Sequence, residues 1–100
     1  MGFLDFIGGM IQDSMNASSA AGNECKDLTP LQICQRYKSN IISISKASGY
    51  LTGLRSKCER APRSQIKEAR DYSYNEWLKE SDSFKADMLY KLVEALDKYL

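Results

Sequence analysis

The stretch LTPLQI, at residues 28–33, contains the strongest secondary-structure signal of the chain. Thr29 is a favoured N-cap residue, Pro30 suits the first helical position, and Gln32 stands where its side chain can complete a capping box. The backbone groups at the start of a helix lack partners within the helix, and these residues supply them. A helix is therefore predicted to begin at residue 30.

Downstream of this start, apolar residues recur every three or four positions, as expected for a helix with one buried face. They are Leu31, Cys34, Tyr37, Ile41, Ile44, Leu51, Leu54 and Cys58. Serine and glycine lower the helix propensity here, so the pattern predicts either one helix to about residue 59 or a break near Gly49, which is favoured. Ser45, Gly49 and Gly53 are spaced by four and predict a smooth stripe on which another helix can pack closely.

A turn is predicted at Pro62, and Ser64 is the expected cap of the helix that follows. A further apolar stripe comprises Ile66, Ala69, Ser73, Trp77, Phe84, Met88, Leu92, Ala95 and Tyr99. It belongs either to one helix or to two, with residues 81–83 capping a last helix from Phe84.

No segment is a convincing strand. The predicted fold class is all-α: a small antiparallel helical hairpin, or a bundle of three to five helices, with a helical domain over 29–100 and an amphipathic N-terminal helix.

The amphipathic N-terminal helix is predicted over residues 1–15, because large apolar side chains gather on one side of its helical wheel. The candidate partner-binding residues on this face are Phe3, Leu4, Phe6, Ile7, Met10 and Ile11. Residues 16–28 are mostly small and polar, which predicts a linker or a frayed helix end that breaks at Gly22 and Asn23. The apolar face can pack on the chain's own core, on a protein partner or second copy, or on a membrane surface. The membrane is the least favoured, because the polar side carries Asp5 and Asp13 instead of lysine or arginine.

The net charge of +1 conceals a basic middle, since residues 30–70 carry nine basic side chains against two acidic ones. The candidate basic patch comprises Arg55, Lys57, Arg60, Arg63, Lys67 and Arg70. Such a cluster can neutralise phosphates or face an acidic protein surface. The favoured interpretation is that the segment faces the acidic last helix in internal or weak surface pairing. Among external partners, an acidic protein surface is favoured over nucleic acid.

The chemistry available to the chain argues against an enzyme. There is no histidine, which removes the commonest general base and the commonest transition-metal ligand. Glu76 and Glu80 are expected to belong to a solvated face paired with Lys79 and other lysines. The three cysteines fit neither a disulfide framework nor a zinc pattern, and reduced, buried thiols are expected. No catalytic residue, metal site or cofactor is predicted.

The leading hypothesis is a small, non-catalytic helical protein that binds another protein stoichiometrically, as an adaptor, inhibitor or immunity factor does. The partner is expected to have an acidic surface or to be a second copy of the chain. A peripheral membrane protein and a nucleic-acid binder acting through residues 55–70 are the alternatives. No apolar run is long enough to span a bilayer and the N-terminus lacks the basic start of a secretory signal, so a cytoplasmic location is expected.

Overall fold

The computed structural model describes residues 19–100, and over these residues the protein is an all-α bundle. Residues 19–24 are helical and lead into a short 3-10 helix, η1 (Cys25–Asp27). Four α-helices follow: α2 (Pro30–Ser39), α3 (Ile44–Cys58), α4 (Arg63–Lys79) and α5 (Ser83–Asp97). The amphipathic helix predicted over 1–15 lies outside the described residues.

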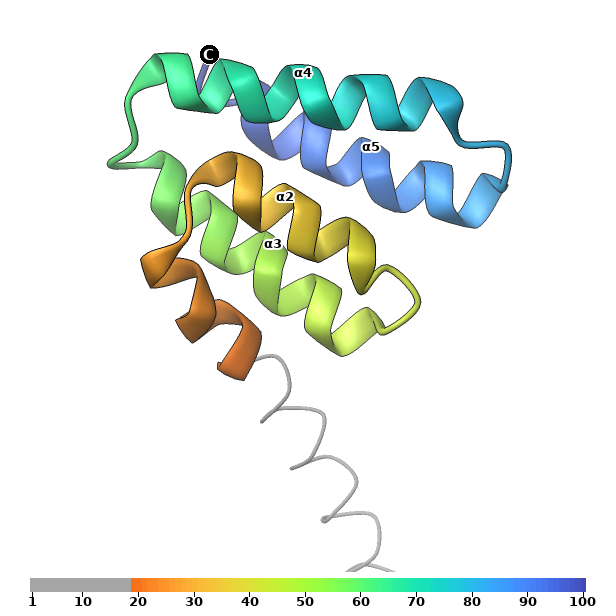
Figure 1. Ribbon diagram of the computed structural model, residues 1–100, viewed down its shortest axis with the longest axis horizontal. Helices are drawn as coiled ribbons and strands as arrows, with labels where there is room; N and C mark the ends of the chain where they lie inside the picture. The colour runs from red at the N-terminus through yellow and green to blue at the C-terminus, as the bar shows by residue number, and fades with distance from the viewer. Residues whose placement is uncertain (1–18) are drawn as a thin grey trace, which may run out of the picture.

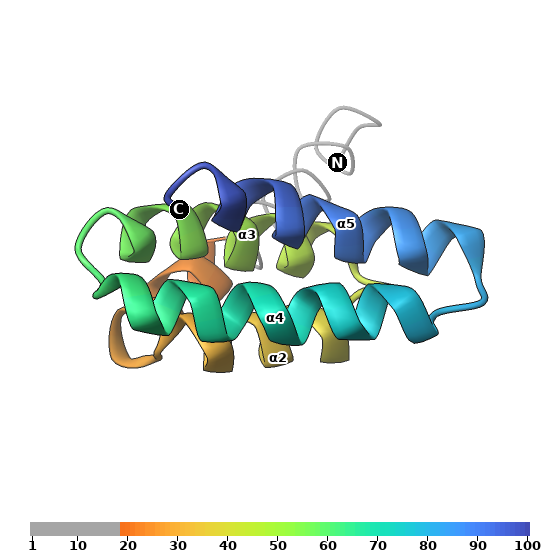
Figure 2. The ribbon, with the colours of Figure 1, turned by 90° about the horizontal axis from the view of Figure 1, so that it is seen from above.

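The helices form two antiparallel hairpins, α2–α3 and α4–α5, that stack on each other (Figure 1, Figure 2). The hairpins are in register at one end, where Lys38 of α2 bonds Glu76 of α4 and the Tyr37 hydroxyl donates to the Met88 carbonyl oxygen at 2.6 Å. Because α2 and α4 run in the same direction, the α2–α3 and α4–α5 turns lie at this same end (Figure 1).

The core lies between the hairpins and contains most residues of the predicted helical stripes, together with Ile33, Leu89 and Leu96, which neither stripe included. Its fully buried side chains include Ile33, Cys34, Leu54, Leu89, Leu92 and Leu96. The Ser73 hydroxyl is also fully buried, and it donates to the Ala69 carbonyl oxygen at 2.9 Å. Burial of each large apolar side chain contributes about 1.5 to 3 kcal/mol, so packing of these stripes is the main source of stability.

Two predicted helix starts are confirmed. The Thr29 hydroxyl accepts from the Gln32 amide at 3.2 Å, and the Gln32 side chain accepts from the Thr29 amide at 3.0 Å, which completes the capping box before α2. The separate last helix is also present, with the Asp82 carboxylate accepting from the Lys85 amide at 2.9 Å. It begins at Ser83, one residue before the predicted Phe84.

The break in the first long helical pattern is not at Gly49, and that prediction is wrong. α2 ends at Ser39, and Asn40 closes it by donating from both its amide and its side chain to the Arg36 carbonyl oxygen. These bonds satisfy carbonyls that the end of a helix leaves without partners. Gly49 is instead buried inside α3.

The predicted cap of the following helix is also wrong. α4 begins at Arg63, and Ser64 lies in its first turn, where it makes no capping bond. Pro62 takes the N-cap position in an extended conformation, and its carbonyl oxygen accepts from the amides of Gln65 and Ile66. Proline supplies no side-chain acceptor, so this helix starts without a side-chain cap.

Residues 19–27 differ from the linker predicted over 16–28, because they are helical and packed on α3. Ala21 and Cys25 are buried there. A Cβ atom on Gly53 would lie 2.5 Å from the Cys25 sulfur, so the stripe of small residues is indeed where another helical segment approaches closely. The segment has no apolar stripe of large side chains, and its packing depends on the shape of the surface it meets.

Candidate functional site

Residues 19–27 are held on the bundle by polar contacts as well as by close packing. Glu24 accepts a hydrogen bond from the Tyr50 hydroxyl at 2.6 Å and forms an ion pair with Arg36 at 2.9 Å. Burial and the Glu24 carboxylate raise the pKa of Tyr50 to about 12, so this hydroxyl remains a donor at neutral pH. The contacts connect the segment to both α3 and α2, and thus set where the chain upstream of Ser19 enters the structure.

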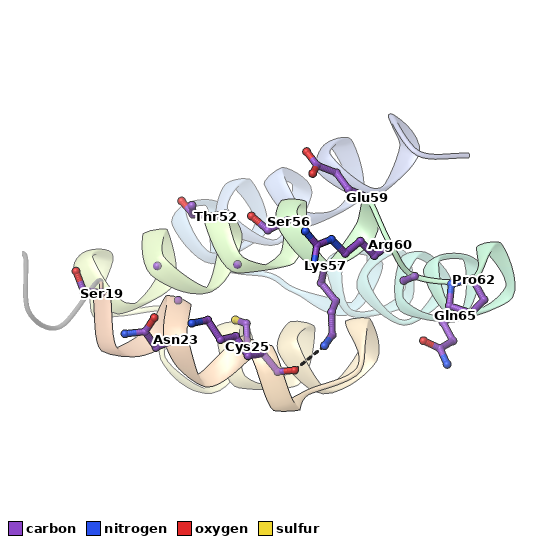
Figure 3. A pocket seen from close by; sticks show the side chains of 15 residues that line it. Ser19, Asn23, Cys25, Thr52, Ser56, Lys57, Glu59, Arg60, Pro62 and Gln65 are labelled. Atoms are coloured by element: carbon purple, nitrogen blue, oxygen red, sulfur yellow. Dashed lines mark hydrogen bonds between the residues drawn. The ribbon is translucent and has the colours of Figure 1, made fainter.

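An open groove of about 1020 Å³ runs along this junction (Figure 3). Ser19 lies at one end, and Pro62 and Gln65 lie at the other. The lining is made largely of small and polar residues, and the Lys57 ammonium crosses it to donate to the Lys26 carbonyl oxygen at 2.8 Å. The groove therefore has mixed polarity and no deep apolar floor.

The six residues of the predicted basic patch are distributed over two helices. Arg55 and Lys57 belong to the last turns of α3 and Arg60 follows it, whereas Arg63, Lys67 and Arg70 lie along α4. All of them are therefore nearer the end of the bundle opposite the α2–α3 turn (Figure 1). No contact in the described structure shows what this patch binds, so its role stays a prediction.

Some of these basic side chains have internal partners. Arg63 donates to the Leu100 carbonyl oxygen. Arg70 pairs with Asp97 at 3.1 Å and lies 4.9 Å from the centre of the Tyr74 ring. Arg55, Arg60 and Lys67 are exposed and have no ion-pair partner between residues 19 and 100.

The aromatic residues next to the basic segment contact one another. The Trp77 ring centre lies 5.6 Å from that of Tyr74 and 5.2 Å from that of Tyr90. Trp77 is partly buried and packs against the core. This ring cluster joins α4 to α5, as expected for the helical stripe to which Trp77 was assigned.

The carboxylates expected to pair with lysines do so at Glu76. Its oxygens lie 2.6 Å from the Lys38 ammonium and 3.9 Å from the Lys79 ammonium. The hydrogen bond from Lys38 lowers the pKa of Glu76, and the same bond raises the pKa of Lys38. The pair bridges α2 and α4, and its geometry is that of a structural contact between charged partners.

The three cysteines are unpaired and buried. Burial raises the pKa of Cys25 and Cys58 to about 11 and that of Cys34 to about 12. A thiol that stays protonated is a poor nucleophile. Within the described part of the chain, no group of three or more histidine, cysteine or acidic side chains is arranged to hold a metal ion.

Sequence reasoning missed a group of exposed apolar side chains at one end of the bundle, here named the apolar end. It consists of Ile42, Ile44, Leu78 and Phe84, whose exposed fractions are 80%, 64%, 59% and 49%. These residues flank the α2–α3 and α4–α5 turns, which lie at the same end of the bundle (Figure 1). Ile44 and Phe84 were assigned to buried stripes, and the structure corrects this because both side chains, in the first turns of α3 and α5, are exposed. Ile42 and Leu78 fall outside both stripes, which was the available signal.

Comparisons of the chain with protein-family models, curated proteins and solved structures found no match. None of the helices between Ser19 and Leu100 has the length and apolar character needed to cross a membrane.

Proposed function

We propose that this chain is a small, non-catalytic helical protein that acts by binding another protein stoichiometrically, in the manner of an adaptor, inhibitor or immunity factor. The observation that supports this most is the apolar end. A single exposed apolar side chain is ordinary on a protein surface, whereas contiguous apolar patches mark interaction sites, and four exposed apolar side chains flank the two turns at this end. Ile42 and Ile44 are more exposed than any other large apolar side chain noted in the described structure.

The rest of the domain supports a binding role more than a catalytic one. Every buried side-chain nitrogen or oxygen atom between residues 19 and 100 has a hydrogen-bond partner, as expected for groups that hold the fold together. The exposed Arg55, Arg60 and Lys67 favour a partner with an acidic region, and free cysteines are typical of a cytoplasmic protein. The predicted partner-binding residues near the N-terminus, such as Phe6 and Ile7, would add apolar area to the same interaction.

The proposal is tested by affinity capture from the organism of origin with the full chain and two double variants. Ile42→Ser with Phe84→Ser removes apolar area from the apolar end, and Arg55→Ser with Arg60→Ser is the matched control at the opposite end. We expect a protein captured in fixed molar ratio by the wild type, lost with the first variant and retained at low salt with the second. Equal capture by all three chains, or no partner at fixed ratio, would overturn the proposal. Circular dichroism verifies that both variants stay folded, as expected for exposed sites.

A further inference from the structure

The path of residues 19–27 shows from which side the N-terminal part of the chain arrives. This segment runs in roughly the same direction as α3 (Figure 1, Figure 3). Gly22 packs beside Gly49, and further along the Lys26 carbonyl oxygen accepts from Lys57. Ser19, the first described residue, therefore lies toward the N-terminal end of α3. That is the end of the helix where Ile42 and Ile44 are exposed.

Eighteen residues precede Ser19, and their sequence carries an apolar face without an assigned partner. A helix over residues 1–15 would be about 22 Å long, at 1.5 Å per residue. Neighbouring helix axes are about 8–10 Å apart, so such a helix is long enough to extend over both hairpin turns of the apolar end.

We infer that, when no partner is bound, the apolar face of residues 1–15 covers the apolar end of its own chain. The residues that make this contact are Phe3, Leu4, Phe6, Ile7, Met10 and Ile11 on one side and Ile42, Ile44, Leu78 and Phe84 on the other. The functional consequence of this contact rests on the proposed function. A protein partner has to displace residues 1–15 from the apolar end in order to bind there.

The N-terminal segment of the same chain is favoured over that of a second copy as the occupant of the apolar end. A short tether holds the N-terminal face at an effective concentration on the order of millimolar near the apolar end. A second copy reaches that concentration only in very concentrated solution. The acidic polar side of the segment disfavours an anionic membrane in the same competition.

Cross-linking of engineered thiols in the full chain tests the inference. Ile7→Cys with Ile42→Cys places one thiol on each proposed surface, and Ile7→Cys with Arg60→Cys is the control at the opposite end. Cys25, Cys34 and Cys58 are buried and should not react with a short bis-maleimide. We expect the first pair to give a cross-linked monomer whose yield does not depend on protein concentration, and the control pair to give much less. Equal yields for the two pairs would overturn the inference, and so would a product that forms only as a dimer at high concentration.

Amide hydrogen exchange provides a second measurement that needs no cysteine. Phe3→Ser, Phe6→Ser and Ile7→Ser are combined in the full chain, which removes apolar area from the cover and leaves the described core intact. We expect amides of the turns at 40–43 and 80–82 to exchange about tenfold faster, with amides of the core helices unchanged. Unchanged exchange at both turns would contradict the inference. Neither experiment involves a partner, so failure here is distinguishable from failure of the capture experiment.

Discussion

Gly53 is the position where one additional carbon atom has the largest predictable effect. A Cβ atom at this position would point at Cys25, whose sulfur and Cβ atoms would lie 2.5 Å and 2.7 Å away. Both atoms belong to a short, buried side chain, and the Cβ atom of Cys25 cannot move away unless its backbone moves too. A side chain at residue 53 is therefore tolerated only if residues 19–27 move away from α3.

We predict that Gly53→Ala destabilises the protein by about 1–3 kcal/mol, the usual effect of overpacking. Gly22→Ala is the matched control, since its nearest heavy atom would be the Gly49 carbonyl oxygen at an ordinary 3.6 Å and alanine favours a helix. Urea unfolding followed by circular dichroism measures both free energies. Equal stability of the two variants would contradict the close approach at Gly53.

The spacing of Ser45, Gly49 and Gly53 predicted a stripe for close packing, and the contact at Gly53 bears this out. The spacing did not identify the segment that packs there. Residues 19–27 are rich in small side chains, and in isolation small side chains carry little information about a partner surface. Only the placement of Cys25 against Gly53 shows that this segment is part of the folded domain.

Among the helices, α2 and α4 differ in how they begin. α2 has a complete capping box at Thr29 and Gln32, whereas α4 begins after Pro62 without a side-chain cap. Local sequence was sufficient for the first start because a capping box involves only neighbouring residues. It was misleading for the second, where Ser64 is a good capping residue that lies inside the first turn instead of before it.

We predict that Thr29→Ala lowers the free energy of unfolding by about 1 kcal/mol, the typical loss for an N-cap. Ser64→Ala is the matched control and should change stability by less than about 0.5 kcal/mol, because its side chain is exposed and caps nothing. Thermal and urea unfolding of the two variants give the comparison. A larger loss at Ser64 than at Thr29 would show that α4 is capped differently from the structure.

Taken as a whole, the domain encloses all three of its thiols. Cys25, Cys34 and Cys58 come from η1, α2 and α3, and the exposed fraction of each is 4% or less. Their burial raises the pKa of each thiol to about 11 or 12, so the reactive thiolate is scarce at neutral pH. Low solvent access and a high pKa thus both protect these three thiols from reaction.

We predict that a thiol reagent such as Ellman's reagent labels none of the three cysteines in the native protein at pH 7 and all three after unfolding in urea. Because the raised pKa values lie well above 9, each buried thiol stays almost wholly protonated even at pH 9, so the native protein should still be labelled far more slowly at pH 9 than an exposed thiol. Time-resolved absorbance provides the readout, with Arg60→Cys as an exposed thiol in the same chain. Rapid labelling of a native cysteine would show that the hairpins or residues 19–27 open readily.

The sequence by itself determined the all-α class and the start of α2, because helical periodicity and side-chain caps are properties of near neighbours in the chain. It offered the separate start of α5 as one of two alternatives. Only the tertiary structure decided that residues 19–27 pack on α3, that Gly49 lies inside a helix, and that Ile44 and Phe84 are exposed. Each of these depends on which surface stands opposite a residue. A periodic pattern shows that a helix has an apolar face, and the packing of the hairpins determines how far along the helix that face is covered.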